Sequence, residues 1–274
     1  MEEKKYCYKY PHPAVTTDCV VFGVDGRKLK ILLIERGNEP YKGYWAFPGG
    51  FLNMDENATQ GALRELEEET GLRLDHIKEF GTFTDVNRDP RERVISIAFY
   101  ALVDKVVVNG GDDAAKAQWF SIDELPPLAF DHNKMLKKAQ QKLKEDLMKR
   151  ITPAFIHTLN NNEIFVFGSN LEGAHGGGAA RIAVDKFGAI WGQGVGLQGQ
   201  SYGIPTMHGG VVTIKPYVDE FIAFAKQHPE MTFLVTKIGC GIAGFRIDEI
   251  APLFAAAVNV ENIHLPQEFW DELI

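Results

Sequence analysis

The stretch GFLNMDENATQGALRELEEETGL, residues 50–72, decides the fold of the first half of the chain. Its apolar spacing and its late glycine predict a helix over residues 57–70. On that helix Glu65, Glu68 and Glu69 stand at positions i, i+3 and i+4, so three carboxylates share one face. Like charges this close repel one another unless a cation neutralises them. A cluster of hard oxygen ligands suits Mg²⁺ or Mn²⁺.

Most glutamate runs are only the solvated face of a helix, and this is the plain alternative. Here, however, the run belongs to a longer pattern of Gly50, five residues, Glu56, seven residues and then residues 64–72. This pattern resembles the Nudix hydrolase box, and every specified position of that box is filled. The resemblance covers residues 8–150 and implies a Nudix αβα sandwich with a mixed sheet.

The resemblance assigns chemistry to the glutamate helix. Divalent ions, Mg²⁺ or Mn²⁺, would clamp a pyrophosphate, neutralise its charge and lower the pKa of an attacking water. The implied catalytic residues are Glu65, Glu68 and Arg64, whose guanidinium can hold the carboxylates in orientation. The implied metal ligands are Glu65, Glu68, Glu69 and Gly50. The family therefore implies an enzyme that hydrolyses the pyrophosphate bond of a nucleoside diphosphate derivative.

The box leaves the general base open. Glu65 is one candidate, but many Nudix relatives use a glutamate from a loop outside the box. Glu92 and Glu124 could serve in that way here, and the sequence does not choose among the three.

Other residues indicate the substrate. The segments 83–85 and 89–91, together with residues 36–38 and 42–45, resemble the ADP-ribose pyrophosphatase branch of the family. That branch implies conversion of ADP-ribose to AMP and ribose 5-phosphate. The candidate substrate-binding residues are arginines for phosphate and aromatic rings for adenine, namely Arg36, Arg91, Arg93, Trp45 and Phe83. The alternative is that these arginines lie on the surface and these aromatics in the core.

The composition changes near residue 150. The first 150 residues hold 23 Lys and Arg against 25 Asp and Glu, whereas the remainder holds 6 against 12 and carries 16 of the 27 glycines. A lysine-rich segment with helical spacing, residues 132–150, precedes the change, and Thr152-Pro153 ends its pattern. The sequence therefore predicts two domains, residues 1–150 and residues 155–274.

Apolar runs and turn residues predict the remaining elements. The predicted strands are 14–24, 29–34, 94–103 and 117–120 in the first domain and 164–167 and 232–236 in the second. A turn at Asp25-Gly26 separates the first two strands. In the second domain, strands lead through glycine loops into helices near Ala179 and Ile247, which is typical of α/β proteins. The polar segment 192–205 is expected to be a loop, either beside the same pocket or mobile.

Two glycine loops in the second domain predict a ligand site. The first places Asn170 shortly before three glycines, and the second, residues 241–245, reads Gly-x-x-Gly-aromatic. Such loops let backbone N–H groups approach an anion. In this order they resemble the loops of macro domains, the ADP-ribose-binding module. The implied ligand-binding residues are Asn170, Gly176, Gly177, Gly178, Gly241, Ile242, Ala243, Gly244 and Phe245.

The macro resemblance implies a three-layer α/β domain that binds or processes ADP-ribose or a derivative. Residues 168–170 depart from the usual Asn-Ala-Ala-Asn run, and a length of about 115 residues is short for such a domain. The domain is also similar to small bacterial and phage proteins with the same Phe-Gly-Ser-Asn and Ile-Gly-Cys-Gly blocks. A glycine-rich structural domain is the alternative.

Net charge and cysteine content narrow the classes of protein to which the chain could belong. The net charge of −8 argues against a general nucleic-acid binder. Three distant cysteines, Cys7, Cys19 and Cys240, make no disulfide framework, which indicates a reducing compartment. Met1–Tyr6 lacks the apolar core of a signal peptide, and no apolar run is long enough to span a bilayer. We expect a cytoplasmic protein with a small-molecule substrate, no nucleic-acid or membrane partner, and a homodimer as a candidate assembly.

Two other functions stay open at this stage. Some relatives of this branch are ligand-sensing transcription regulators without turnover, although residues 151–274 are acidic and show no helix-turn-helix pattern. The chain could also be a Nudix enzyme for another nucleoside diphosphate, with a second domain that is purely structural.

Overall fold

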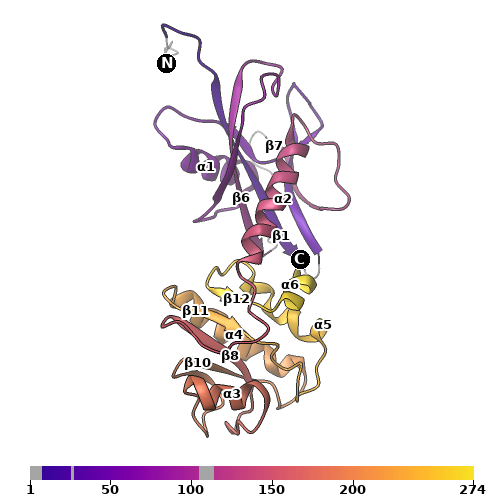
Figure 1. Cartoon of the computed structure of the whole chain (residues 1–274). Coiled ribbons are helices and arrows are strands. Elements are labelled where there is room, and N and C mark those ends of the chain that lie inside the picture. The colour runs from indigo at the N-terminus through magenta and orange to yellow at the C-terminus, as the bar shows by residue number, and fades with distance from the viewer. Residues whose placement is uncertain (1–7, 26–27, 105–113) are drawn as a thin grey trace. The chain divides into compact units, whose positions relative to one another are not determined.

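Two separate sheets organise the chain (Figure 1). The computed structural model describes residues 8–25, 28–104 and 114–274. Clustering of contacts divides the chain into two compact units, Met1–Gly23 with Lys30–Leu143 and Val24–Leu29 with Lys144–Ile274. Predictions that fall on Met1–Tyr6, Cys7 and Gly26 lie outside the described residues, and the domain limits of 1–150 and 155–274 stay a prediction.

The first unit contains a seven-stranded sheet among its described residues, with the order β3-β2-β1-β6-β5. In addition, β4 pairs with β1 and β7 pairs with β2. The strands are β1 (Ala14–Asp25), β2 (Lys28–Arg36), β3 (Trp45–Ala46), β4 (Gly49–Phe51), β5 (Lys78–Phe83), β6 (Val94–Asp104) and β7 (Ala114–Ser121). All four strands predicted for this unit are confirmed, each with slightly longer bounds.

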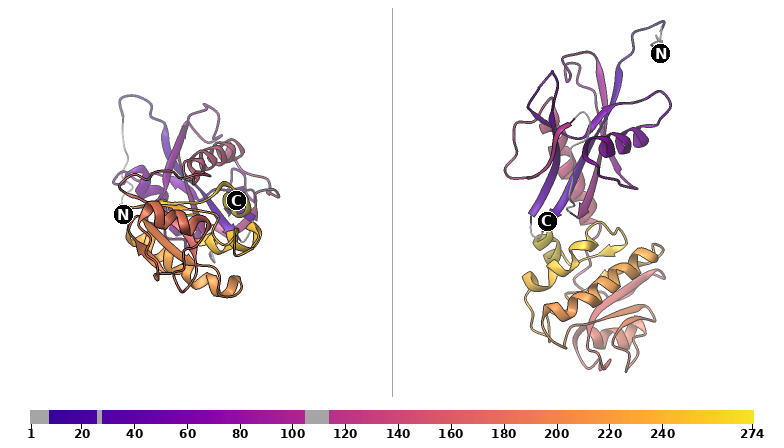
Figure 2. Two further views of the ribbon diagram at one scale, coloured as in Figure 1. Left: turned by 60° about the horizontal axis from the view of Figure 1, so that its bottom comes forward. Right: turned by 180° about the vertical axis from the view of Figure 1, so that it is seen from behind.

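The two helices of the first unit cover opposite faces of the sheet, as the views of Figures 1 and 2 agree. They are α1 (Ala58–Thr70) and α2 (His132–Met148). Side chains alternate along a strand, so Cys19 and Val21 of β1 pack with Leu66 of α1 in one apolar cluster. Phe22 points the other way and meets Tyr100 edge to face, with ring centroids 6.5 Å apart. This arrangement gives the helix–sheet–helix layering expected from the sequence.

Helix α1 begins and ends at the residues that the sequence indicates. The Asn57 side chain accepts the backbone N–H of Gln60 at 3.0 Å, and the Gln60 side chain accepts that of Asn57 at 2.9 Å. Such a capping box stabilises a helix end by about 1 kcal/mol. At the other end Gly71 adopts φ 71°, a left-handed conformation that favours glycine. Both ends of the glutamate helix are therefore fixed locally.

The second unit contains a five-stranded sheet with the order β12-β11-β8-β10-β9. Its strands are β8 (Glu163–Ser169), β9 (Gly196–Gln198), β10 (Ser201–Pro205), β11 (Thr232–Val235) and β12 (Ile263–His264). β9 pairs antiparallel with β10, whereas the other neighbours are parallel. The carboxyl ends of β8, β10 and β11 therefore meet at one edge, where open α/β sheets bind ligands.

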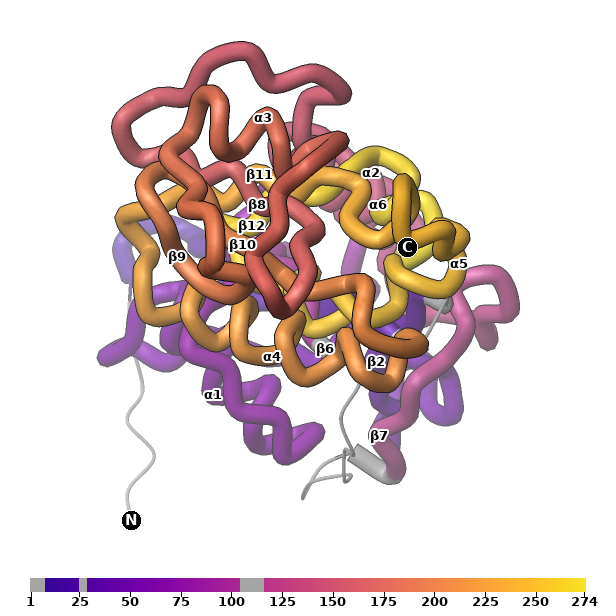
Figure 3. Tube along the Cα trace, turned by 90° about the horizontal axis from the view of Figure 1, so that it is seen from below, coloured from indigo at the N-terminus to yellow at the C-terminus, as the bar shows by residue number. Residues whose placement is uncertain are grey.

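Helices lie on both faces of this second sheet, and Figure 3 shows α3 and α4 on opposite sides of the strands. The helices are α3 (Gly178–Phe187), α4 (Val211–Gln227), α5 (Ile247–Ile250) and α6 (Gln267–Leu273), with a 3₁₀ helix η1 (Ala251–Ala257). Phe165 of β8 packs on Phe187 of α3. Phe233 of β11 pairs in register with Ile164 and so faces the other way, onto Phe221 of α4. The unit has three layers; the macro-like assignment remains a prediction.

One local prediction in this unit is wrong and another is confirmed. The segment 192–205 is not simply a loop, because it includes the β9–β10 hairpin, and Tyr202 and Ile204 of β10 are buried. The helix predicted to begin near Ile247 does begin there, as a single α turn that continues into η1, where Pro252 stands in the first turn and has no N–H to donate. Within the described residues, no helix has both the length and the apolar character needed to cross a membrane.

Candidate active site of the first unit and glycine-lined cleft of the second

Strand β4 brings the glycines of the box against α1. Gly50 pairs with Thr17 of β1, and a Cβ built on Gly50 would lie only 2.4 Å from Oε1 of Glu65. A Cβ on Gly49 would lie 2.2 Å from the backbone oxygen of Thr17. Gly49 therefore needs glycine because a Cβ would meet backbone, and the lack of a Cβ on Gly50 lets the Glu65 carboxylate lie directly on the backbone of β4.

The three glutamates of the shared face differ in environment. Glu69 is largely buried, and its Oε2 accepts the backbone N–H of Gly49 at 2.8 Å. Burial raises the pKa of Glu69 to about 8, although the bond from Gly49 opposes the shift. Burial likewise raises the pKa of Glu65, against the influence of Arg64. The side chain of Glu68 is 58% exposed, so this carboxylate lies at the mouth of the site.

Arg64 is the cation that organises the box. Its Nε and Nη2 donate to both oxygens of Glu56 at 2.9 and 2.6 Å, and this pair lowers the pKa of Glu56 to about 2. Its Nη1 donates to Glu65 at 2.9 Å and to Glu68 at 3.0 Å. Its Nη2 also reaches the carbonyl oxygen of Phe51 at 3.3 Å. One guanidinium thus ties the start of the box to two of the predicted metal ligands.

The donor set suits a divalent ion chemically. All the predicted ligands are oxygens, and the partly buried carboxylates of Glu65 and Glu69 lack a buried cation that fully offsets their desolvation. In the described parts of the chain, however, no three His, Cys, Asp or Glu side chains are gathered around one point. Glu65 and Glu68 bond to Arg64, and Glu69 bonds to Gly49. The role of these residues as metal ligands therefore remains a prediction that the donor chemistry favours.

A buried polar network that the sequence did not indicate supports the loop before β4. His132, at the start of α2, accepts the backbone N–H of Phe47 through Nδ1 at 3.0 Å. Its Nε2 must then carry the proton, and it faces the carboxylate of Asp18 at 3.5 Å. Asp18 also accepts the Ser96 hydroxyl. The only sequence signal was a helical pattern that begins at residue 132.

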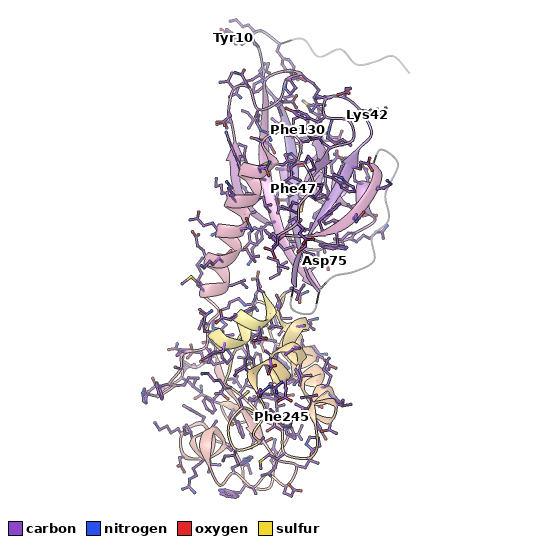
Figure 4. All side chains as sticks on the ribbon, turned by 90° about the vertical axis from the view of Figure 1, so that its right-hand side faces the viewer. Tyr10, Lys42, Phe47, Asp75, Phe130 and Phe245 are labelled. Atoms are coloured by element: carbon purple, nitrogen blue, oxygen red, sulfur yellow. The ribbon has the colours of Figure 1, made fainter. Side chains whose placement is uncertain are left out.

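The ring of His132 is stacked on Phe47, with centroids 4.8 Å apart and planes at 7°. Figure 4 labels Phe47 among the strands of the first unit. Burial lowers the pKa of His132, so the ring is neutral at pH 7 and keeps Nδ1 as an acceptor. Nearby, Arg88 forms a bidentate pair with Asp131 at 2.8 and 3.1 Å. The segment that leads into Gly49 is thus held by buried groups on β1 and α2.

The predicted substrate-binding residues separate into two groups. Arg36 and Arg91 both lie on the ring of Phe130, with guanidinium carbons 4.7 and 5.7 Å from its centroid. Trp45 instead packs on Phe120 of β7 at 4.5 Å.

Phe83 and Arg93 also lie apart from the pair on Phe130. Phe83 meets Phe80 and carries Lys138 over its ring. Arg93 donates to the carbonyl oxygen of Asp85 at 3.2 Å. The structure therefore joins Arg36 and Arg91 and leaves the other three candidates in separate contacts. Of the candidate bases outside the box, Glu92 and Glu124 are both exposed.

In the second unit, the two predicted loops converge on one cavity of about 180 Å³. The cavity lies at the carboxyl ends of β8, β10 and β11. Ser169, Thr206 and Thr236, at the ends of these three strands, are among its lining residues. The predicted ligand-binding residues that line it are Asn170, Gly176, Gly177, Gly178, Gly241, Ile242 and Ala243. Gly244 and Phe245 are not among its lining residues; Phe245, labelled in Figure 4, lies next to Gly239 instead.

A larger cavity of about 880 Å³ adjoins the first and shares Gly178, Thr236, Lys237 and other lining residues with it. Its further walls are mainly apolar and include Phe155, whose side chain is 82% exposed. The side chain of Asn170 is occupied within its own loop, because it exchanges hydrogen bonds of 2.8 and 2.9 Å with the backbone of Ala174. Asn170 therefore shapes the rim of the smaller cavity.

Several known proteins are similar to part of this chain. Residues 12–139 match the NUDIX domain family. An ADP-ribose pyrophosphatase of Methanocaldococcus jannaschii is 44% identical over 135 residues, which are 49% of this chain and 76% of that protein. An ADPR responsive transcriptional repressor, NtrR, of Acinetobacter baylyi is 33% identical over 175 residues, 60% of this chain and 70% of the relative. Among solved structures, the chain is similar to the NUDIX domain of Shewanella oneidensis NrtR complexed with ADP ribose, at 29% identity and a TM-score of 0.47. That match covers 49% of this chain and 90% of the other. The match to the NUDIX domain family and the two relatives that are 44% and 33% identical establish that the chain belongs to the Nudix family, as a Nudix pyrophosphohydrolase.

Proposed function

We propose that the first unit hydrolyses ADP-ribose to AMP and ribose 5-phosphate with the help of Mg²⁺ or Mn²⁺. The observation that carries this proposal is the position of Glu65 and Glu69, two desolvated carboxylates held against the backbone of Gly49 and Gly50. The choice of substrate rests on the 44% identity to a protein named as an ADP-ribose pyrophosphatase.

The reaction adds one water across the pyrophosphate bond. The water oxygen bonds to one phosphorus, the bond from that phosphorus to the bridging oxygen breaks, and the other phosphate leaves with the electron pair. A divalent ion, when bound by Glu65, Glu68 and Glu69, neutralises phosphate charge and makes water more acidic. The chain itself contributes orientation: Arg64 fixes Glu65 and Glu68, and the Gly49 N–H fixes Glu69.

The test is turnover by the full chain with Mg²⁺ on a panel of ADP-ribose, NADH, sugar nucleotides and nucleoside triphosphates. Glu68→Gln removes one proposed metal ligand, and Glu67→Gln is the matched control because Glu67 bonds to Arg73 at 2.7 Å, away from that face. We expect ADP-ribose to be the preferred substrate, Glu68→Gln to reduce kcat about a hundredfold or more, and Glu67→Gln to stay within about twofold of the wild type. Preference for another diphosphate would overturn the ADP-ribose assignment, and no turnover would overturn hydrolysis altogether.

A second candidate function is regulation by a bound ligand without turnover. The 33% identity to a repressor that responds to ADPR favours it, and the expectation that nucleic acid is not a partner has no support from that comparison. The acidic charge of residues 151–274 argues against a DNA-binding surface there. ADP-ribose bound by the full chain with no metal-dependent turnover, together with specific retention of DNA, would favour regulation over hydrolysis.

For the second unit we propose that the glycine-lined cavity binds ADP-ribose or a derivative. What supports this is the convergence of both loops at the carboxyl edge of the sheet, beside a larger apolar cavity that could accept a ring. Gly241 has open space where a Cβ would be, so a side chain fits there without a clash. Gly241→Asp would place negative charge in the cavity, and Gly241→Asn is the neutral control of equal size.

The experiment is calorimetric titration of the full chain with ADP-ribose in EDTA, which prevents metal-dependent turnover. We expect Gly241→Asp to weaken one binding event at least tenfold and Gly241→Asn to weaken it much less. Equal affinities in all three proteins would remove the second site from consideration and leave a structural domain.

A further inference from the structure

Phe130 lies in a backbone conformation that few residues of its kind adopt. It follows β7 and precedes α2, and its φ is 50°, in the left-handed region. The surrounding backbone holds it there, because Trp45 accepts the N–H of Ala129 at 2.8 Å and the next residues, Asp131 and His132, are fixed by buried partners. Strain of this kind in a non-glycine residue points to a role for the side chain it presents.

The ring of Phe130 gathers two cations. Arg36 lies 4.7 Å from its centroid, Arg91 lies 5.7 Å away, and Arg91 also lies 5.2 Å from the ring of Phe51. Tyr41 closes another side of the ring in an edge contact at 4.8 Å. The half-buried aromatic cluster therefore fixes two guanidinium groups that originate from distant parts of the sequence.

The charges of this cluster are not balanced. Arg91 pairs with Asp89 at 2.7 Å. Arg36, in contrast, forms no ion pair with any described residue; its Nε donates to the carbonyl oxygen of Pro40 at 2.9 Å. Burial lowers the pKa of Arg36, and the charge of Arg91 lowers it further. Asp89, Glu69 and Asp18 act on Arg36 only from a distance, so among the described residues its Nη groups have no hydrogen-bond partner and can donate to an anion.

The cluster borders the glutamate site. Phe51, which contacts Arg91, directly follows Gly50 on β4, and its carbonyl oxygen accepts a bond from Arg64. Arg36 lies near enough to Glu69 for the two charges to act on each other. A polyanionic substrate that reaches the glutamates through a metal ion would therefore meet Arg36 and Arg91 with another part of its charge.

We propose that Phe130 is a positioning residue that holds Arg36 and Arg91 together as the direct phosphate-binding part of the substrate site. This inference rests on the proposed hydrolysis of a nucleoside diphosphate derivative. The ring does not touch the reacting atoms. It sets the separation of two guanidiniums, which suits the oxygens of a diphosphate better than two independent side chains would.

The test is steady-state kinetics with ADP-ribose at saturating Mg²⁺ for Phe130→Leu, which removes the aromatic face, and Phe130→Tyr, which retains it. We expect Phe130→Leu to raise KM about tenfold with kcat changed less than threefold, and Phe130→Tyr to remain within about twofold of the wild type. A double-mutant cycle with Arg36→Met separates positioning from folding. In the Arg36→Met background, Phe130→Leu should raise KM by less than threefold, because its partner is already absent.

Melting temperatures accompany every variant, and ADP-ribose binding in EDTA gives a readout independent of turnover. An unchanged KM in folded Phe130→Leu would overturn the inference, as would full additivity with Arg36→Met. If the wild type turns over no diphosphate, the proposed function fails by itself. In that case weaker ADP-ribose binding by Phe130→Leu, rescued by Phe130→Tyr, would still support the positioning role.

Discussion

The candidate site of the first unit is built from charged side chains, whereas that of the second unit is built mainly from backbone. In the first unit charged side chains form the site, with Glu65, Glu68 and Glu69 on one helix face and Arg64 bonded to two of them. In the second unit the cavity is lined largely by glycine and other small residues at the carboxyl ends of parallel strands. A site made of side chains should be sensitive to charge and to metal, whereas a site made of backbone should be sensitive to an added Cβ wherever that Cβ would meet neighbouring atoms.

The largest contrast should come from Gly50→Ala. The new Cβ would lie 2.4 Å from Oε1 of Glu65, which is the end of a flexible side chain and can turn aside. We therefore expect the fold to survive and kcat to fall on the order of a hundredfold, because a small displacement of a catalytic group is costly. Kinetics and a melting curve on the same sample check this. Normal kcat would show that the position of the Glu65 carboxylate is not limiting.

Gly194→Ala in the second unit is expected to lower stability and leave turnover by the first unit largely unchanged, the reverse of Gly50→Ala. Its Cβ would lie 2.0 Å from the carbonyl oxygen of Asn170, which is backbone and cannot turn aside. Overpacking at a buried position destabilises a domain by about 1–3 kcal/mol, so the unit should unfold earlier in urea, with metal-dependent turnover by the first unit largely kept. Gly210→Ala is the control, because open space surrounds that position. Equal unfolding midpoints for the two variants would contradict this account.

The glutamate helix could be predicted well because its signals are local. Asn57, Gly71 and the i, i+3, i+4 spacing act within a few residues, and the helix begins and ends where they indicate. The roles of Asp18, His132 and Phe130 could not be predicted, since they depend on partners from β1, β2, α2 and the loop before β4 that only the folded sheet brings together.

In the second unit, both glycine loops contribute to the lining of one cavity, because parallel strands place their carboxyl ends at one edge, while their role in ligand binding stays a prediction. The β9–β10 hairpin was missed, because Gly196 and Gly199 read as loop residues although Tyr202 and Ile204 are core. Strand β10 takes stability from pairing with β8, a long-range contact without a local signal, and β9 pairs with β10.

A smaller difference between the two units should appear in how ligand binding by each depends on pH. The pKa of Glu69 is raised from 4.5 to about 8, so the metal-free folded state holds a proton that the unfolded chain has lost. Its contribution to stability is therefore complete below pH 4.5 and is lost as the pH rises through about 8. Metal binding must displace this proton, so affinity for Mg²⁺ should rise with pH, by up to about tenfold per unit, and level off above pH 8.

Calorimetric titration with Mg²⁺ between pH 6 and pH 9 measures this effect, and Glu69→Gln should remove the pH dependence along with most of the affinity. ADP-ribose binding by the second unit, measured in EDTA, should vary much less over the same range, since backbone N–H groups do not titrate. A metal affinity that is flat with pH would show that Glu69 binds no proton in the metal-free protein.

The smallest expected effect concerns His132, which holds the loop before β4 in the first unit. Burial lowers the pKa of His132 below its ordinary value of about 6.5, so the unfolded chain takes up a proton before the folded one does. Stability is then complete above pH 6.5 and declines as the pH falls. His132→Asn, which does not titrate, should flatten this decline by at most about 1.4 kcal/mol per pH unit. Urea unfolding of the first unit between pH 5 and pH 7.5 checks the slope, with the exposed His76→Asn as control. Identical slopes in both variants would mean that His132 takes up a proton as easily in the folded protein as in the unfolded chain. That result would contradict a neutral ring whose Nδ1 accepts the Phe47 N–H.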